Sequence, residues 1–149
     1  MKTPDFRRAR NVMGYMALPY EVDMRPVLKR LMVLKKNVFL RAVNSGRGQI
    51  RIFPVTHLKR DLARGSYGIL EPRPGKCPAG RPSQMDLVLV PGIGFDRKGG
   101  RLGHGKGYFD KFLKKVKRAR RIGLAFREQI LEKVPCEKHD QRVHRVITG

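Results

Sequence analysis

The residues best suited to chemistry lie in one glycine-rich segment. Residues 87–113 read LVLVPGIGFDRKGGRLGHGKGYFDKFL, which contains seven glycines. Glycine permits positive φ and lets backbone N–H groups approach a ligand with no Cβ in the way. Arg101, His104 and Lys106 add cationic side chains to this loop. The N-terminus of the helix that follows adds free N–H donors and a partial positive charge, so the segment predicts a phosphate-binding loop.

The segment departs from the two standard nucleotide-binding motifs. Gly100 to Lys106 fits the GxxxxGK pattern, but Gly107 stands where Ser or Thr would bind magnesium. The GHGKG stretch is GxGxG rather than the GxGxxG of dinucleotide-binding loops. Asp110, in the first turn of the next helix, is therefore a candidate magnesium ligand, and Asp140, before the last strand, is a second. The alternatives are a tight connection without a ligand and carboxylates that only stabilise a helix end.

Strands and helices alternate along the chain, and this order predicts how the loop is positioned. Apolar runs predict strands at residues 12–17, 37–42, 49–54, 87–90, 122–125 and 143–148. Helices are predicted from an N-cap at Asp23 through Pro26 to Lys35, from about Tyr108, and over residues 128–133. Loops are predicted at residues 43–48 and 65–84. The pattern predicts a single α/β domain over residues 1–149, with a mostly parallel central sheet and helices on both faces, a Rossmann-like three-layer fold.

Charge is the most unusual property of the composition. The 149 residues include 34 Lys and Arg against 12 Asp and Glu, a formal net charge of +22. Both halves of the chain are basic, and the densest run, Lys111 to Arg121, has seven basic residues in eleven. Such charge attracts polyanions, so nucleic acid is a candidate partner beside a small phosphate ligand.

Several classes of protein are excluded or disfavoured. No apolar run approaches the roughly 18 to 20 residues of a membrane span, so no membrane partner is expected. The two cysteines, Cys77 and Cys136, cannot form a disulfide scaffold. The first residues lack the apolar stretch of a secretory signal. We therefore expect a reducing compartment, the cytoplasm, with a mitochondrial address left open.

Longer stretches of the chain resemble one enzyme family. The run GFDRKGGRLGHGKGYFDKFL is similar to the signature of 5-formyltetrahydrofolate cyclo-ligases, also called 5,10-methenyltetrahydrofolate synthetases. The likeness continues in GLAFREQILEKVP and HDQRVHRVIT, and upstream in Glu21-Val22-Asp23 and in the GILEP of residues 68–72. It covers nearly the whole chain.

The resemblance implies an activity and a set of site residues. The activity would be ATP-dependent closure of 5-formyltetrahydrofolate, with or without a polyglutamate tail, to 5,10-methenyltetrahydrofolate, releasing ADP and phosphate with Mg²⁺ as cofactor. Arg101 and Lys106 would be the catalytic cations, and Asp110 and Asp140 the magnesium ligands. The nucleotide-binding residues would be Arg101, Leu102, Gly103, His104, Gly105, Lys106, Gly107, Tyr108 and Phe109. The folate-binding residues would be Met16, Glu21, His104 and Tyr108. Tyr15, Tyr20 and Phe53 are further candidates for ring contacts.

The chain also departs from the family pattern. Its members normally begin with a helical segment whose Lys and Arg side chains reach ATP, and we expect this segment to be lacking here. His144 stands where members often have an acid. The alternative function is that of a catalytically weak family member recruited to bind RNA or a ribonucleoprotein through its basic surface.

Overall fold

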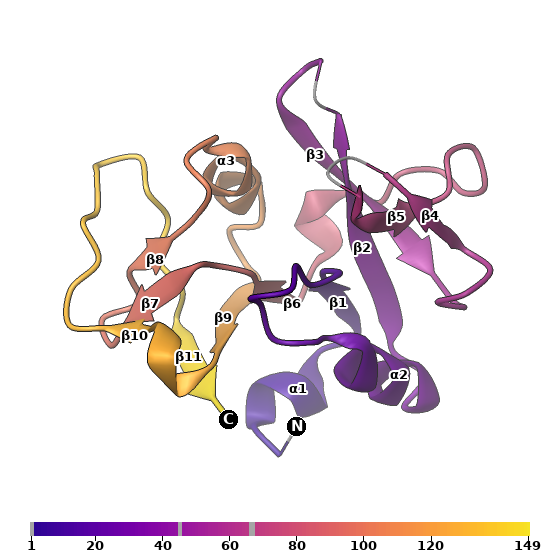
Figure 1. Cartoon of the computed structure of the whole chain (residues 1–149). Helices are drawn as coiled ribbons and strands as arrows, with labels where there is room; N and C mark the ends of the chain where they lie inside the picture. The colour runs from indigo at the N-terminus through magenta and orange to yellow at the C-terminus, as the bar shows by residue number, and fades with distance from the viewer. Residues whose placement is uncertain (1, 45, 66–67) are drawn as a thin grey trace.

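A computed structural model describes residues 2–44, 46–65 and 68–149 of the chain. Its main sheet has the strand order β11-β9-β6-β1-β2-β3 (Figure 1). All neighbouring pairs are parallel except β2 and β3, which form an antiparallel hairpin. The strands are β1 (Asn11–Gly14), β2 (Asn37–Asn44), β3 (Gln49–Val55), β6 (Leu87–Val90), β9 (Arg120–Ala125) and β11 (Arg145–Thr148). The predicted α/β class with a mostly parallel sheet is confirmed.

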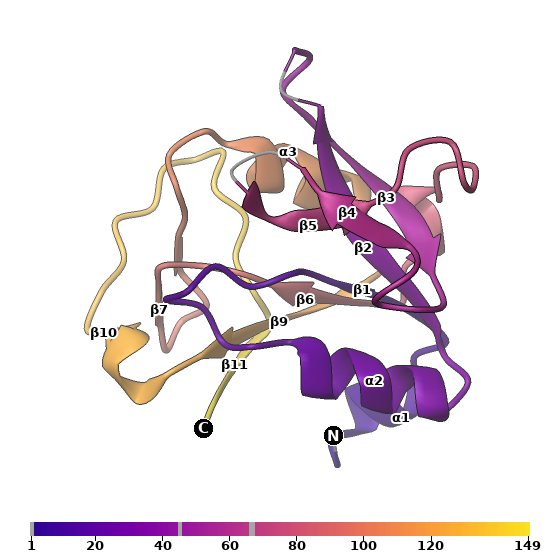
Figure 2. The same cartoon turned by 45° about the vertical axis from the view of Figure 1, so that its right-hand side comes forward.

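Helices cover both faces of this sheet. α1 (Pro4–Arg8) and α2 (Arg25–Val33) lie against one face, and α3 (Tyr108–Lys115) lies against the other (Figure 2). The predicted three-layer arrangement is confirmed. Within the part of the chain that is described, no helix is long and apolar enough to cross a membrane.

Two hydrophobic cores follow from the alternation of side chains along β1. Val12 belongs to the core beneath α2, with Leu28 and Leu31 of that helix. Met13, the next residue, belongs to the core beneath α3, with Phe112. Complete burial of a side chain of this size stabilises a fold by about 1.5–3 kcal/mol. The two cores therefore hold the helices, and the loops attached to them, on the sheet.

The order of the strands creates a crevice between β1 and β6. From β1 the chain crosses by α2 to β2, and from β6 it crosses by α3 to β9 on the other side. Where neighbouring parallel strands diverge in this way, the loops at their carboxyl ends separate and leave room for a ligand. The loop after β1 and the glycine-rich segment after β6 both begin at this crevice.

The segment after β9 differs from the prediction. Instead of a helix over residues 128–133, a 3-10 turn, η3 (Arg127–Gln129), leads into a short strand, β10 (Ile130–Leu131), that pairs with β7 (Gly94–Asp96). The side-chain amide of Gln129 donates to backbone carbonyls of Tyr20, Gly92 and Ile93 at 3.1–3.3 Å. These long-range contacts outweigh the local preference for helix.

Two segments that were predicted as loops, residues 65–84 and the glycine-rich segment, contain regular structure. The loop at residues 65–84 includes β5 (Leu70–Pro72), which pairs with β4 (Leu62–Arg64), and the 3-10 turn η2 (Pro82–Gln84). The glycine-rich segment folds into a hairpin of β7 and β8 (Arg101–Leu102). Residues 45, 66 and 67 of the predicted loops lie outside the described residues.

Some predicted boundaries also shift. β1 ends at Gly14 rather than at residue 17, β2 continues to Asn44, and the last strand begins at Arg145. α2 begins at Arg25 and ends at Val33, before the predicted Lys35, and its N-cap is Met24 rather than the predicted Asp23. The carboxylate of Asp23 instead accepts the N–H of Arg25 at 3.0 Å.

The outer edge strand β3 is partly covered. Pro54 within it lies opposite Phe39 of β2. The N–H of Gly80 donates to the carbonyl of Ile52 at 2.7 Å, which adds an isolated bridge on the outer side of the strand.

Gly14 tests the packing of α2 on β1. A Cβ at this position would lie 2.6 Å from Cδ2 of Leu28, whose side chain is fully buried. Gly14→Ala is therefore expected to lower the free energy of unfolding by about 1–3 kcal/mol, the usual cost of an overpacked core. Urea denaturation measures this loss. Gly149→Ala, where an added Cβ meets nothing within 4 Å, is the control and should leave the midpoint unchanged.

Candidate functional site

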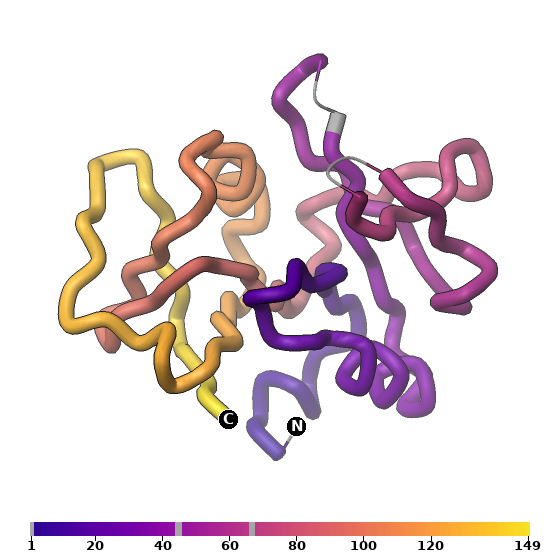
Figure 3. The backbone as a smooth tube through the Cα atoms, viewed as in Figure 1, coloured from indigo at the N-terminus to yellow at the C-terminus, as the bar shows by residue number. Residues whose placement is uncertain are grey.

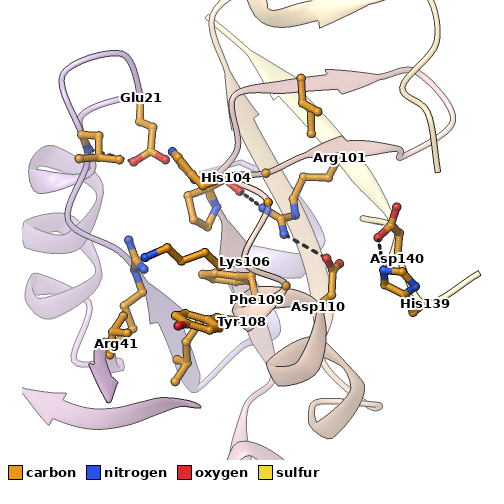
Figure 4. Close-up of a pocket in the computed structure, with 18 of the residues that line it drawn as sticks. Glu21, Arg41, Arg101, His104, Lys106, Tyr108, Phe109, Asp110, His139 and Asp140 are labelled. Atoms are coloured by element: carbon orange, nitrogen blue, oxygen red, sulfur yellow. Dashed lines mark hydrogen bonds and ion pairs between the residues drawn. The ribbon is translucent and has the colours of Figure 1, made fainter. Parts of the chain in front are cut away.

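A cavity of about 670 Å³ opens at the carboxyl ends of β1 and β6 (Figure 4). Its walls come from the loop after β1, the β2–β3 hairpin, the glycine-rich segment, the start of α3 and the segment before Asp140. The predicted site residues that line it are Glu21, Arg101, Leu102, Gly103, His104, Gly105, Lys106, Gly107, Tyr108, Phe109, Asp110 and Asp140. The fold thus brings twelve predicted residues to one cavity from distant parts of the chain.

Met16 is the predicted site residue that does not line this cavity; it packs instead against the core beneath α2. Among the candidate ring contacts, Tyr20 lines the cavity, whereas Tyr15 is fully buried in that same core. Phe53 also lies outside the cavity lining, beneath the guanidinium of Arg51 at 5.4 Å.

Two glycines in the loop adopt left-handed backbone conformations. Gly105 has φ 86° and Gly107 has φ 70°, and Gly107 directly precedes the first residue of α3. An added Cβ at either position would meet no atom within 4 Å. Glycine is therefore favoured at both positions by the positive φ and not by a lack of space. They let the chain reverse at the cavity and present the N-terminus of α3 to it.

The carboxylate of Asp96 holds two walls of the cavity together. Its Oδ1 accepts the N–H groups of Lys98 and Gly100 at 2.9 and 2.8 Å, which closes the turn between β7 and β8. Its Oδ2 accepts the N–H of Val134 at 2.9 Å, in the segment that continues to Asp140. Figure 3 shows these two stretches running side by side. Asp96 is only 4% exposed, and the hydrogen bond from Val134, followed by those from Gly100 and Lys98, lowers its pKa.

Glu21 presents a half-satisfied carboxylate to the cavity. Its side chain is 5% exposed, and Oε2 accepts the N–H of Leu18 at 2.9 Å. The N–H of Glu21 in turn donates to the carbonyl of Leu18 at 2.9 Å, so a tight turn fixes the side chain. Oε1 is buried and has no hydrogen-bond partner among the described residues. A buried carboxylate oxygen of this kind is costly unless a ligand donates to it.

A contact across the mouth of the cavity joins the loop after β1 to the glycine-rich loop. The hydroxyl of Tyr20 hydrogen-bonds Nε2 of His104, and their ring centroids lie 5.7 Å apart. Both groups come from loops, and both side chains reach solvent. Tyr20 and His104, both predicted to contact a ligand, therefore contact each other across the cavity.

Arg101 lies deeper in the cavity wall than a free phosphate-binding cation would. Its side chain is 7% exposed; Nη1 donates to the carbonyl of Pro91 at 3.1 Å, and Nη2 lies 3.7 Å from Oδ2 of Asp110. The guanidinium also lies 5.4 Å from the ring centroid of Phe109. Burial lowers its pKa, and the charges of Asp110 and Asp140 oppose this shift. Its buried Nε has no partner among the described residues.

Asp110 and Asp140 are held by backbone groups. Oδ1 of Asp110 accepts the N–H of Gln141 at 3.0 Å, which brings the start of α3 next to the segment that contains Asp140. Oδ2 of Asp140 accepts the N–H of Glu137 at 2.8 Å, and Oδ1 lies 3.6 Å from Nε2 of His139. Each carboxylate thus keeps one oxygen that no backbone N–H occupies.

Two charged residues on strands that line the cavity were not predicted from the sequence. Arg41 on β2 and Glu71 on β5 both line it. Oε1 of Glu71 accepts the N–H of Val43 at 3.3 Å. Neither residue belongs to the glycine-rich segment. Arg41 lies in a predicted strand with no recognisable motif, and Glu71 lies in the GILEP stretch, to which no site role was assigned. The pairing of β2 with β3 and of β5 with β4, which positions these two residues, could not be predicted from local sequence pattern.

The basic run and His144 lie outside the cavity lining. Lys111, Lys114 and Lys115 are exposed on α3, and the run continues through the turn to β9. His144 exchanges hydrogen bonds with the backbone of Arg121, with its Nδ1 accepting at 3.0 Å, and so joins the start of β11 to β9. The prediction of nucleic-acid binding through this run stays untested.

The model of the 5-formyltetrahydrofolate cyclo-ligase family matches residues 1–149. The chain belongs to this family. A probable 5-formyltetrahydrofolate cyclo-ligase of Schizosaccharomyces pombe is 32% identical over 163 residues, which cover 99% of this chain and 79% of the relative. The mouse 5-formyltetrahydrofolate cyclo-ligase is 27% identical over 151 residues, covering 95% of this chain and 74% of the relative.

Solved structures of the cyclo-ligase family agree with the fold. The NMR structure of Aquifex aeolicus 5,10-methenyltetrahydrofolate synthetase matches with a TM-score of 0.83 at 32% identity, covering 99% of this chain and 72% of that one. A 5,10-methenyltetrahydrofolate synthetase from Mycoplasma pneumoniae, 21% identical, has the same fold with a TM-score of 0.74 and covers 98% of this chain and 76% of that one. The predicted family is confirmed.

Asp96 tests the link between the two walls. Asp96→Ala leaves three backbone N–H groups without their acceptor and is expected to lower the free energy of unfolding by about 3 kcal/mol or more. The native pKa of Asp96 is lowered, so its contribution is complete above the ordinary carboxyl pKa of about 4 and is lost as pH falls through the native value.

Urea denaturation at several pH values measures both effects. The variant should lose stability at neutral pH and show a weaker dependence on pH below about 4 than the parent protein. Asp23→Ala, which removes a half-exposed carboxylate beside Arg25, is the control and should cost about 1 kcal/mol or less. Equal losses in the two variants would contradict the role assigned to Asp96.

Proposed function

We propose that this protein closes 5-formyltetrahydrofolate to 5,10-methenyltetrahydrofolate at the expense of ATP, which is converted to ADP and phosphate. The observation that carries the proposal is the buried, half-satisfied carboxylate of Glu21 facing the same cavity as the glycine-rich loop. Membership of the cyclo-ligase family supplies the class of reaction.

The proposed chemistry consists of two displacements. The formyl oxygen of the folate attacks the γ-phosphorus of ATP, and the bond to the ADP oxygen breaks. N10 of the folate then attacks the formyl carbon and loses its proton, and the former formyl oxygen leaves with the phosphate. Phosphorylation is needed because an unmodified carbonyl oxygen is a poor leaving group. The task of the protein is chiefly to align the two substrates and to neutralise charge.

Glu21 is suited to hold the pterin ring. The pterin carries neighbouring N–H groups on one edge, and a carboxylate can accept from such an edge. Since Oε2 is already fixed by Leu18, the free Oε1 is the oxygen that remains for the ligand. Tyr20 and Tyr108, which also line the cavity, supply aromatic surface for the folate.

The glycine-rich loop is suited to hold the phosphates. Gly105 and Gly107 leave backbone N–H groups accessible, and the N-terminus of α3 favours negative charge. Lys106 adds an ammonium group that points into the cavity (Figure 4). Arg101, held by Pro91 and Asp110, contributes charge from the wall. These groups can neutralise charge on a transferring phosphoryl group.

The carboxylates of the cavity fit a magnesium ion bound together with a nucleotide. The described residues contain no group of three or more His, Cys, Asp or Glu arranged to bind a metal ion. Mg²⁺ in nucleotide sites commonly takes only one or two carboxylates, with phosphate oxygens and water completing its shell. Asp110 and Asp140 each have one oxygen without a backbone donor, next to Arg101 and His139 respectively, and the ion would supply neutralisation of phosphate charge.

Direct assay tests the proposed reaction. Purified protein with Mg²⁺, ATP and 5-formyltetrahydrofolate should generate the methenyl product, followed by its near-ultraviolet absorbance, and should release one phosphate for each product formed. Omitting ATP should abolish the signal. Absence of product above a control without protein, together with salt-sensitive RNA binding, would favour the alternative function instead.

Substitutions in the loop and in α3 test the assigned residues. Lys106→Ala and Asp110→Ala should each lower turnover by about a hundredfold, because both remove charge that stabilises phosphoryl transfer. Lys111→Ala removes the neighbouring exposed cation on the same helix and should change turnover less than about twofold. Thermal unfolding identifies losses that come from instability. Full activity in both site variants would rule out these assignments.

A further inference from the structure

Arg41 stands out as the cavity cation whose partner is missing. It lies on β2, where its backbone faces Ile52 of β3, and its side chain lines the cavity. The residues that the structure describes offer its guanidinium no hydrogen-bond acceptor and no carboxylate at ion-pair distance. Its one described contact is with the ring of Phe109, 6.0 Å from the centroid. Burial lowers its pKa, because the charge is held partly away from water.

The charged groups near Arg41 determine which kind of ligand group its guanidinium can bind. Glu21, Glu71 and Tyr20 are near enough to oppose the lowering of its pKa, yet the oxygens of both carboxylates are fixed elsewhere or face the cavity. Two carboxylates beside the guanidinium disfavour a phosphate at this position. They do not disfavour a neutral carbonyl oxygen, which a guanidinium N–H binds well.

Arg41 also lies at the folate end of the proposed site. In Figure 4, Arg41 and Glu21 occupy one end of the cavity, and Asp110 and Asp140 occupy the other. If Glu21 accepts from the N–H edge of the pterin, the next group around the ring is the C4 carbonyl. The formyl oxygen on N5 follows on the same side. A donor at this end of the cavity therefore meets ligand oxygens.

We propose that Arg41 binds the folate by donating hydrogen bonds to a carbonyl oxygen on the side of the pterin that includes C4 and the N5-formyl group. This inference rests on the proposed function and adds a second pterin-recognising residue to Glu21. The two residues are complementary, because Glu21 accepts from the N–H groups of the ring and Arg41 donates to its oxygens. Together they favour this edge of the pterin over heterocycles that lack a carbonyl next to their N–H groups.

Binding of folates without ATP tests this assignment. Isothermal titration with 5-formyltetrahydrofolate should show that Arg41→Gln weakens binding by about 10- to 100-fold, the usual effect of losing a hydrogen bond to a charged group. Arg51→Gln is the matched control, since Arg51 is exposed on the adjacent strand, outside the cavity lining, and should bind as the parent does. Binding of MgATP should be unchanged in both variants.

A second ligand identifies the oxygen. 5-Methyltetrahydrofolate keeps the C4 carbonyl and lacks the formyl oxygen. An equal loss for both folates in Arg41→Gln assigns the contact to the C4 carbonyl, and a loss confined to 5-formyltetrahydrofolate assigns it to the formyl group. Either result supports the proposal.

The melting temperature of Arg41→Gln distinguishes a role of Arg41 in binding from a role in holding the fold together. Because Arg41 has no described acceptor, Arg41→Gln should melt at the same temperature as the parent or above it. Unchanged folate binding in a folded variant overturns the proposal while leaving the proposed function intact, as does a loss confined to MgATP. Failure of the parent protein to bind either folate overturns both.

Discussion

The buried carboxylate of Asp96 is the interaction on which the arrangement of the site depends. Three backbone N–H groups converge on it, two from the turn that begins the glycine-rich hairpin and one from Val134. These stretches lie far apart in sequence, and the carboxylate adds to the pairing of β7 with β10 in holding them together. A charged acceptor that is 4% exposed makes their separation costly, so Arg101 and Asp140 face one cavity.

Several polar groups of the cavity lack hydrogen-bond partners among the described residues, whereas both oxygens of the Asp96 carboxylate have them. Oε1 of Glu21, Nε of Arg101 and the guanidinium of Arg41 all lack described acceptors or donors, although they are buried or partly buried. Outside the cavity, Thr3, Tyr15 and Arg121 each also have one buried side-chain atom without a described hydrogen-bond partner. Unmet hydrogen-bonding capacity within the cavity is the expected state of a site that is completed by its ligands, and the cores on the two faces of the sheet offset its cost.

Much of this architecture could be predicted from the sequence because its signals are local. The apolar run of Leu87–Val90 and the stripe on α3 follow from periodicity, and the signature from Arg101 to Asp110 carried most of the site. Arg41 and Glu71 escaped prediction because strand register brings them to the cavity. The helix predicted at residues 128–133 was wrong because the long-range contacts of Gln129 outweigh local preference.

The outer strand β3 is protected against edge-to-edge aggregation in concentrated solution. An exposed sheet edge is a template for pairing with another chain, and proteins protect such edges with proline, charge or a covering segment. β3 has all three: Pro54 lacks an N–H, Arg51 is exposed, and Gly80 occupies the carbonyl of Ile52. On the opposite edge, β11 is short and begins with the exposed Arg145. Part of the large positive charge thus protects the sheet against edge-to-edge aggregation.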